Sequence, residues 1–268
     1  MVKKLLGYEI KYYLKIVVFY LPITILMGFL VRIIQFFKTD HFIYDLLLSS
    51  SMMLLYVATI VTVCATTVLA VIRFYKNLYS SEGYLTFALP VNNHQHIISK
   101  ILGYVIFELL SVAAVIIGWI IAFIGVKEVW SIFSSFFTVL GQIPNKVHLF
   151  IYIIEIIIMA ALSVCINPLL YYSCITIGQV AKKHKILLSI GVYYGYSIIV
   201  QVLATIFSIV IMLMGTTGAF ENLGIWIGNH PYAILHILFC SIIIITAGIG
   251  VLFYYITYKI MTHKLNLE

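Results

Sequence analysis

Two carboxylates interrupt long apolar stretches of this chain, Glu108 and Glu155. An acidic group at the centre of a membrane-spanning helix costs about 2.5–3.5 kcal/mol on insertion scales, so each carboxylate should face protein or water rather than lipid. A carboxylate in such a position could line a substrate path or relay protons. It could equally form a hydrogen bond between helices near a helix end, and the residue type does not decide between these roles.

A second group of candidates lies in the apolar segment 189–215. Tyr193, Tyr194 and Gln201 are candidate contacts for an amphipathic substrate, although tyrosines also anchor helices at membrane interfaces. Gly191 and Gly195 form a pair of small residues four positions apart, at which a second helix could approach closely. This pair predicts either packing within one subunit or a dimer interface.

The sequence lacks the patterns of a nucleotide or metal site. No GxxxxGK[ST] loop is present and no GxGxxG follows a strand, so we expect the chain to bind no nucleotide by itself. The close pair His94 and His96 has no cysteine or carboxylate with ligand spacing nearby and is interpreted as a solvated turn. The four cysteines all fall in apolar segments without metal-ligand spacing, and we expect no cofactor on this chain.

Composition assigns the chain to the membrane proteins. Apolar residues make up 63% and charged residues 9%, against roughly 45–50% and 25% in soluble domains. Segments long enough to cross a bilayer predict an all-α protein with one membrane domain over 1–268. A β-barrel is excluded because 151–166 is apolar on nearly every face instead of alternating. The six predicted spans are 16–37, 45–72, 101–126, 148–178, 189–215 and 232–258, with a kink at Pro168 in the fourth.

The positive charges predict the orientation. Twelve of the 16 lysines and arginines fall in the two termini and in the loops at 73–100 and 182–185, and four fall on the other side. Because cytoplasmic loops carry the excess of lysine and arginine, both termini should be cytoplasmic, in a bacterial cell membrane. The net charge of +7 then follows from topology, and no nucleic-acid partner is expected.

Two short elements should lie on the cytoplasmic surface. The first is residues 1–15, where apolar side chains recur at helical spacing and lysines occupy the opposite face. This pattern predicts an interfacial elbow helix against lipid headgroups, and the alternative is a simple extension of the first span. The second is a helix within 80–92, capped by Ser80 or Ser81 and ended by Pro90. Exposed apolar residues on so small an element need a partner surface, either lipid headgroups or another protein.

The outward connections are rich in aromatic residues and glycine. Residues 127–147 and 216–231 have no room for another crossing, and we expect helices that lie in the outer leaflet or dip back into it.

The central loop RFYKNLYSSEGYLTFALPVNNHQHIISKIL, from Arg73 onward, together with the basic elbow and six spans, resembles the permease subunit of a type-2 ATP-binding cassette (ABC) exporter of Gram-positive bacteria. The similarity covers the whole chain and is most specific at 82–90, at Ile177-Gly178-Gln179 with Lys182-Lys183, and in the tail 264–268. The large outer domains of some relatives are absent.

The resemblance implies a partner and a mechanism. In that family the central loop carries a coupling helix that docks on a separate ATPase subunit, which holds ATP and Mg²⁺. Two permeases, identical or different, enclose a path lined by the second and fifth spans, here 45–72 and 189–215. An exporter of an antimicrobial peptide, lipid or amphipathic drug is implied, with no catalytic residue on this chain. The matching coupling residues are Ser81, Glu82, Gly83, Tyr84, Leu85, Phe87, Leu89 and Pro90.

Two rival functions remain open at this point. In an ion-coupled secondary transporter or channel, Glu108 and Glu155 would bind the driving ion and the central loop would only lie on the membrane. A membrane scaffold or sensor partner without transport activity is the third reading.

Overall fold

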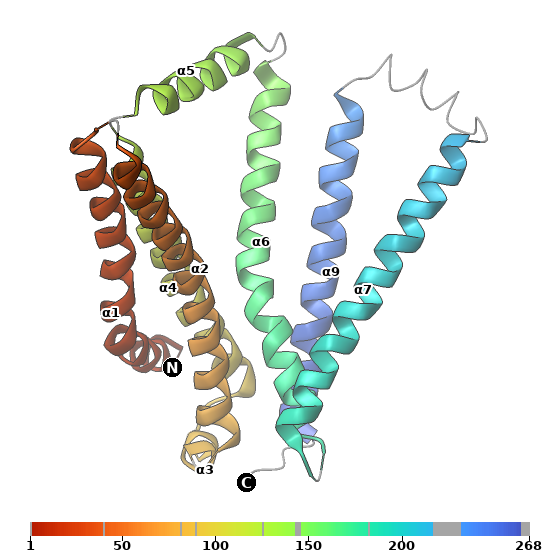
Figure 1. Ribbon diagram of the computed structural model, residues 1–268. Helices are drawn as coiled ribbons and strands as arrows, with labels where there is room; N and C mark the ends of the chain where they lie inside the picture. Colours follow the sequence, from red (N-terminus) through yellow and green to blue (C-terminus); the bar gives the residue numbers. More distant parts are fainter. Residues whose placement is uncertain are drawn as a thin grey trace. The chain divides into compact units, whose positions relative to one another are not determined.

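A computed structural model describes residues 2–39, 41–80, 82–88, 90–124, 126–142, 146–181, 183–216 and 232–263. Its regular elements over these residues are all α-helices, and none of the described residues is in a β-strand (Figure 1). The prediction of an all-α protein is confirmed.

Six of the helices are long and apolar enough to cross a membrane, so the chain is a multi-pass membrane protein. Two shorter helices accompany them: α3 follows α2 in the central loop, and α5 connects α4 to α6. The helices are α1 (Val2–Phe36), α2 (Phe42–Tyr79), α3 (Glu82–Phe87), α4 (Asn93–Phe123), α5 (Lys127–Gln142), α6 (Lys146–Gly178), α7 (Lys185–Thr216) and α9 (Ala233–His263).

Several boundaries differ from the sequence prediction. The expected elbow at 1–15 is helical but is continuous with the first span in α1, whose N-terminal part turns away from the rest of the helix (Figure 1). α2 continues to Tyr79, and α4 begins at Asn93. The interpretation of His94 to His96 as a solvated turn is therefore wrong, because these residues form the first turn of α4 and His96 is buried.

The outer connections are described in part. The expected non-spanning helix at 127–147 is present as α5. The predicted outer element at 216–231 lies, beyond Thr216, outside the described residues.

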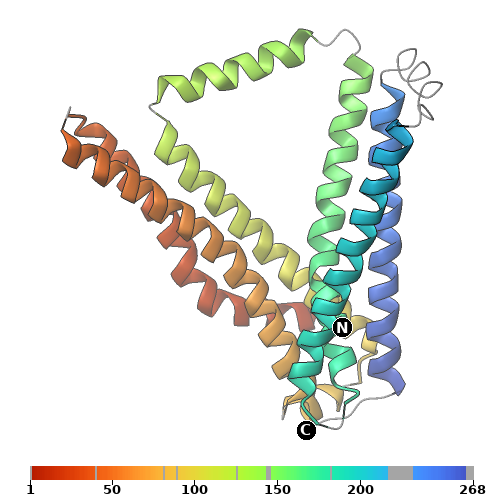
Figure 2. The ribbon, with the colours of Figure 1, turned by 45° about the vertical axis from the view of Figure 1, so that its right-hand side comes forward.

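The chain divides into two compact units. Unit 1 comprises Met1–Leu78 and Glu82–Pro144, and unit 2 comprises Tyr79–Ser81 and Asn145–Glu268. α1, α2 and α4 run side by side in unit 1, and α6, α7 and α9 form unit 2 (Figures 1 and 2). The single permease domain over 1–268 remains a prediction.

In unit 1, α1 packs closely along α4 because both helices carry a glycine where they meet. A Cβ atom on Gly28 would collide with the backbone of Gly118, and one on Gly118 would lie 3.0 Å from the carbonyl oxygen of Thr24. Small residues at such a contact let the two backbones approach each other. Val31, Leu55 and Ala122 form a fully buried cluster that adds α2 to this pair.

Hydroxyl groups also join the three long helices of unit 1. The hydroxyls of Tyr20 and Thr66 lie 2.9 Å apart, and Thr66 in turn lies 2.7 Å from Ser111. The hydroxyls of Thr24 and Thr62 form a second link between α1 and α2. A hydrogen bond between membrane helices contributes only about 0.6 kcal/mol to stability. These bonds therefore mainly fix how α1, α2 and α4 are aligned along one another.

In unit 2, α6 packs against both α9 and α7. The start of α7 lies against the end of α6, where Ser189 and the backbone of Lys185 fill the space beside Gly178. Toward its other end α7 diverges from α6 (Figure 1). Pro168 lies inside α6, where it removes one backbone hydrogen bond, and the kink at this residue stays a prediction.

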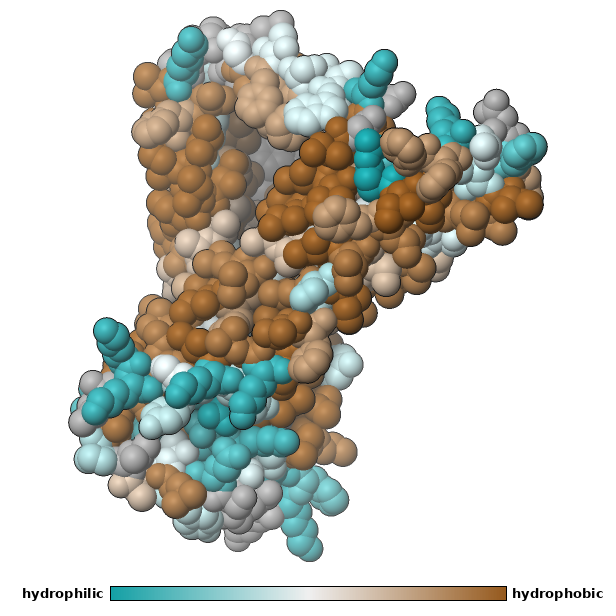
Figure 3. All heavy atoms as spheres, turned by 90° about the vertical axis from the view of Figure 1, so that its left-hand side faces the viewer, coloured by the Kyte–Doolittle hydropathy of each residue, from teal (hydrophilic) through white to brown (hydrophobic). Residues whose placement is uncertain are grey.

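The surface of unit 1 reflects a lipid environment. Apolar side chains cover the middle of the face shown in Figure 3, and hydrophilic side chains collect at the end where α3 lies. Apolar residues of the spans are widely exposed, for example Phe19 at 73% and Met53 at 70%. In water this area would drive aggregation, whereas lipid acyl chains cover it without cost.

Candidate functional site

The short helix α3 exposes apolar side chains on one face and buries the other. Tyr84 and Leu85 are 58% and 76% exposed, whereas Gly83 and Thr86 are buried. Six residues are too few for a stable isolated helix, so contacts with the rest of unit 1 must hold α3 in place. Of the predicted coupling residues, Ser81 and Leu89 lie outside the described residues, and Pro90 follows the helix without belonging to it.

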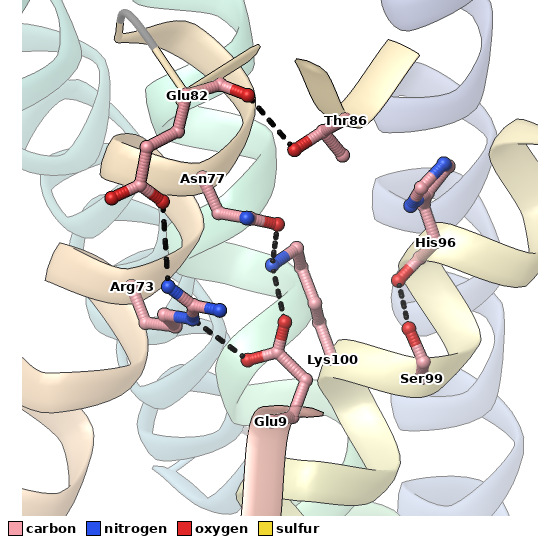
Figure 4. A network of polar contacts seen from close by, with 8 residues as sticks. All are labelled: Glu9, Arg73, Asn77, Glu82, Thr86, His96, Ser99 and Lys100. Atoms are coloured by element: carbon pink, nitrogen blue, oxygen red, sulfur yellow. Dashed lines mark hydrogen bonds and ion pairs between the residues drawn. The ribbon is translucent and has the colours of Figure 1, made fainter. Parts of the chain in front are cut away.

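A buried cluster of ion pairs lies next to α3 (Figure 4), and Glu9 of α1 is at its centre. Glu9 is 5% exposed, and each of its carboxylate oxygens binds a different cation. Oε1 accepts a hydrogen bond from Nζ of Lys100 at 2.8 Å, and Oε2 accepts one from Nε of Arg73 at 3.2 Å. A buried charge is tolerated only when it is paired and hydrogen-bonded, and both conditions are met here.

Lys100 is held on two sides. Besides Glu9, its ammonium group donates to Oδ1 of Asn77 at 2.7 Å, and only 2% of the residue is exposed. Gly103, one turn further along α4, leaves room for this approach, since a Cβ there would lie 3.2 Å from Cβ of Glu9. The cluster therefore ties α1, α2 and α4 together at one end of unit 1.

Arg73 extends the cluster to α3. Its Nη1 lies 3.5 Å from Oε2 of Glu82, the first residue of α3, and its guanidinium group covers the ring of Tyr12 at 4.4 Å. Two cations and two anions thus form a chain of neutral total charge, Lys100–Glu9–Arg73–Glu82, which ends on the short helix (Figure 4). Glu82 is half exposed, so the last link is weaker than the buried links.

The other end of α3 contacts α4. The ring of Phe87 lies 6.1 Å from the ring of His96, centroid to centroid. His96 is 2% exposed and its Nε2 has no hydrogen-bond partner among the described residues. Phe87 is therefore partly a packing residue, whereas Tyr84 and Leu85 are free to meet a partner.

Tyr79, the last residue of α2, makes a contact of its own outside the ion-pair cluster. Tyr79, at the end of α2, groups with unit 2, and its hydroxyl donates to Oγ1 of Thr176 in α6 at 3.0 Å.

The candidate path residues are not assembled into one site within either unit. Glu108 is buried in α4 of unit 1, beside Tyr104, and its Oε2 has no partner among the described residues. Tyr193 stacks on Tyr171 of α6 at 5.7 Å. Tyr194 and Gln201 are exposed, and their role in a path remains a prediction.

Glu155 and the small-residue pair both lie in unit 2. Glu155 is buried in α6 and bonds to His236 of α9, so it joins two helices. Gly191 and Gly195 have open space within 4 Å of a Cβ built on either residue. Packing of this pair inside unit 2 is thus absent from the described residues, and its role as a dimer interface stays a prediction.

Sequence reasoning missed the ion-pair cluster. Their positions in the sequence indicate only a topological role for Arg73 and Lys100, and no motif includes Glu9. A usable signal was present, because Glu9 lies one turn before Tyr13, on the apolar side of an otherwise basic helix. An acidic residue on that face calls for a cationic partner within the protein.

Among the described residues, no group of three or more histidines, cysteines and acidic residues is placed to hold a metal ion. Comparison of the chain with protein-family models, curated proteins and solved structures gave no match.

Proposed function

We propose that this chain is the permease subunit of an ATP-driven ABC exporter, and that α3 transmits the movement of a separate ATPase subunit to the spans. The observation that carries the proposal is the connection of α3 to a buried ion-pair cluster shared by three spanning helices. The resemblance of the central loop to coupling loops of type-2 exporters points to the same role.

The proposed coupling follows from the contacts. An ATPase that binds Tyr84 and Leu85 would pull or push a helix that is too short to act alone. The force would pass through Glu82 to Arg73, and from Arg73 to Glu9 and Lys100, which belong to different spans. Closure of the ATPase pair can drive a change in the path only if it binds α3 more strongly in one of the two states.

The proposed assembly contains two permeases and ATPase subunits that hold ATP and Mg²⁺. The cytoplasmic placement of α3 belongs to this proposal, in a bacterial cell membrane with both termini inside. The proposed cargo is an amphipathic molecule such as an antimicrobial peptide, a lipid or a drug, since the spans are almost wholly apolar.

The test is co-purification of an ATPase subunit with the full-length permease. Replacing both Tyr84 and Leu85 with Asp should lower the association by about tenfold or more, because an interface anchor contributes about 2 kcal/mol or more. Both side chains are exposed, so unit 1 should fold and insert normally.

The matched control is Phe133→Asp in α5, which is also non-spanning and exposed but lies at the opposite end of unit 1 (Figure 1). This variant should bind the ATPase as well as the wild type does. Unchanged association of the Tyr84/Leu85 variant, with insertion intact, would reject the coupling role.

A second candidate function is ion-coupled secondary transport or a channel. The observation in its favour is the buried Glu155, whose carboxylate is bonded to a histidine. This function requires transport that survives depletion of ATP, whereas the exporter must stop.

A further inference from the structure

A cluster of ionisable side chains lies where α6 and α9 begin, outside the site described around α3. Glu155 is 7% exposed, and its Oε1 lies 2.9 Å from Nδ1 of His236. Its Oε2 is buried without a hydrogen-bond partner among the described residues. A carboxylate that is half satisfied in a buried place is costly to keep ionised, and it can be neutralised by a proton.

The histidine bonded to Glu155 is itself bonded to a second histidine. Nε2 of His236 lies 2.9 Å from Nδ1 of His148, which precedes Glu155 by two helical turns in α6. The row Glu155–His236–His148 therefore joins three ionisable groups through two contacts of hydrogen-bond length. His148 is only partly buried, so the row runs from a buried carboxylate to an imidazole that solvent can reach.

Aromatic stacking holds the two imidazoles in line. The ring of His148 stacks on Tyr232 at 4.7 Å, and the ring of His236 stacks on Tyr152 at 4.3 Å. The hydroxyl of Tyr152 donates to the backbone carbonyl of Tyr232 at 2.9 Å, so this phenol is already engaged. These contacts hold both imidazole rings without competing for their nitrogens.

The contacts restrict the positions of the protons. With Glu155 ionised, Nδ1 of His236 must carry the proton that it donates to the carboxylate. Nε2 of a neutral His236 is then an acceptor, so Nδ1 of His148 must be the donor at the second contact. This leaves Nε2 of His148 as the basic nitrogen at the exposed end of the row.

We propose that His148, His236 and Glu155 form a proton-binding relay, which takes up one proton from solution at His148 and stores it on Glu155. A proton that binds Nε2 of His148 is balanced by transfer of the Nδ1 proton to Nε2 of His236. The Nδ1 proton of His236 then passes to Oε1 of Glu155. Both imidazoles end neutral with their tautomers exchanged, and the carboxylate changes from a charge of −1 to 0.

The relay ends at Glu155. Residues 156–178 of α6 and 237–258 of α9 contain no Asp, Glu, His, Lys or Arg, so neither helix continues the row. A binding site rather than a path through unit 2 is therefore proposed. A metal ion is the less suitable ligand, since no set of three possible ligands is in place among the described residues.

The other described groups that face Glu155 carry no positive charge that would compensate its negative charge. Tyr152 comes from α6, and Cys240 from α9 has its Sγ 3.8 Å from Oε1 of Glu155. Within the described part of the chain no lysine or arginine forms an ion pair with Glu155, and Lys146 at the start of α6 is exposed. Protonation would thus remove the charge from the α6–α9 contact, which makes that contact responsive to the proton concentration on its side of the membrane.

The test is infrared difference spectroscopy of the purified full-length chain in lipid vesicles, recorded as the pH is lowered. The wild type should gain a C=O stretching band of a protonated carboxyl group, and Glu155→Gln should lose that band. Glu108→Gln, a change at the other buried carboxylate, should keep it. Absence of any band that depends on Glu155 would overturn the proposal.

Histidine variants separate a relay from an isolated carboxyl group. In His236→Gln the side chain keeps an amide donor but cannot accept and pass on a proton, so the midpoint of the Glu155 band should move by about one pH unit or more, as for strongly coupled sites. His148→Gln should also move it. His41→Gln, a change at an exposed histidine of unit 1, should leave it unchanged. An identical midpoint in all three variants would overturn the relay.

A second readout needs no substitution in the cluster. In nitrogen-15 NMR spectra of the wild-type chain, the signals of His148 and His236 should change with the same midpoint as the carboxyl band, since the three groups share one proton. Independent midpoints would contradict the proposal even if a variant failed to fold. No ATPase subunit enters these measurements, so their outcome is independent of the proposed exporter function.

Discussion

At the scale of single residues, Glu9 is the central residue of the proposed coupling site. It is the buried anion between two cations, Arg73 and Lys100, each of which approaches a different carboxylate oxygen. Loss of Glu9 leaves the buried ammonium group of Lys100 facing the partly buried guanidinium group of Arg73. Loss of Lys100 leaves a carboxylate that still pairs with Arg73. The two residues should therefore contribute unequally to stability.

Replacing Glu9 with Gln should lower the free energy of unfolding of the purified chain by about 3–5 kcal/mol, the usual effect of leaving buried charge without its partner. Lys100→Met should cost less, about 1.5–3 kcal/mol, because one charged hydrogen-bond partner remains. Equilibrium unfolding in detergent measures both values.

Two further variants test the direct link between these side chains. The Glu9→Gln, Lys100→Met double variant should cost less than the sum of the single changes, because the two side chains interact directly. Lys183→Met, a change at an exposed lysine, should have little effect. A fully additive double variant would show that the 2.8 Å contact contributes nothing.

At the scale of elements, the short and the long helices depend on different forces. α3 has six residues, too few for a stable isolated helix, so it depends on side-chain contacts. The sequence predicts this helix within 80–92, and the structure has it at Glu82–Phe87. The spans α1 and α4 are continuous helices, and their closeness depends on two glycines.

The contact between Gly28 of α1 and Gly118 of α4 predicts the effect of adding one methyl group at Gly28. Gly28→Ala should force α1 away from α4, because the added Cβ would collide with the backbone of Gly118, which cannot rotate aside. The thermal midpoint of unfolding of the purified chain should fall clearly. Gly191→Ala, placed in a span where a Cβ meets open space, should be neutral or stabilising by up to about 1 kcal/mol. Equal effects of the two changes would contradict the role of Gly28 as a packing residue.

At the scale of the whole molecule, the six helices that are long and apolar enough to span a membrane predict that both termini lie on the same side of it. The positive charges predict that this side is the cytoplasm. α3 and α5 lie at opposite ends of unit 1 (Figure 1), so they should meet different aqueous compartments.

Labelling of single cysteines in intact cells tests this orientation. In a background without the four native cysteines, Leu85→Cys in α3 should react with a membrane-impermeant maleimide only after the cells are opened. Phe133→Cys in α5 should react from outside. The reverse pattern would place α3 outside and would make contact with a cytoplasmic ATPase impossible.

The sequence predicted the number, kind and approximate extent of the spans, because apolar length is a local property that sets where a helix can cross lipid. It also located the short helix of the central loop, through Glu82 in its first turn and Pro90 just beyond it. The helix ends were less accurate: α2 and α4 extend beyond their apolar runs, since tertiary contacts bury polar residues such as Lys100 and His96.

Tertiary structure alone decided which polar groups meet. Glu9 is 64 residues from Arg73 and 91 from Lys100, and Glu155 is 81 residues from His236. Apolar periodicity orients each helix toward protein or lipid but does not select its neighbour, so pairs so distant in sequence become contacts only when the helices pack. Both the ion-pair cluster behind α3 and the row of histidines at Glu155 are products of that packing.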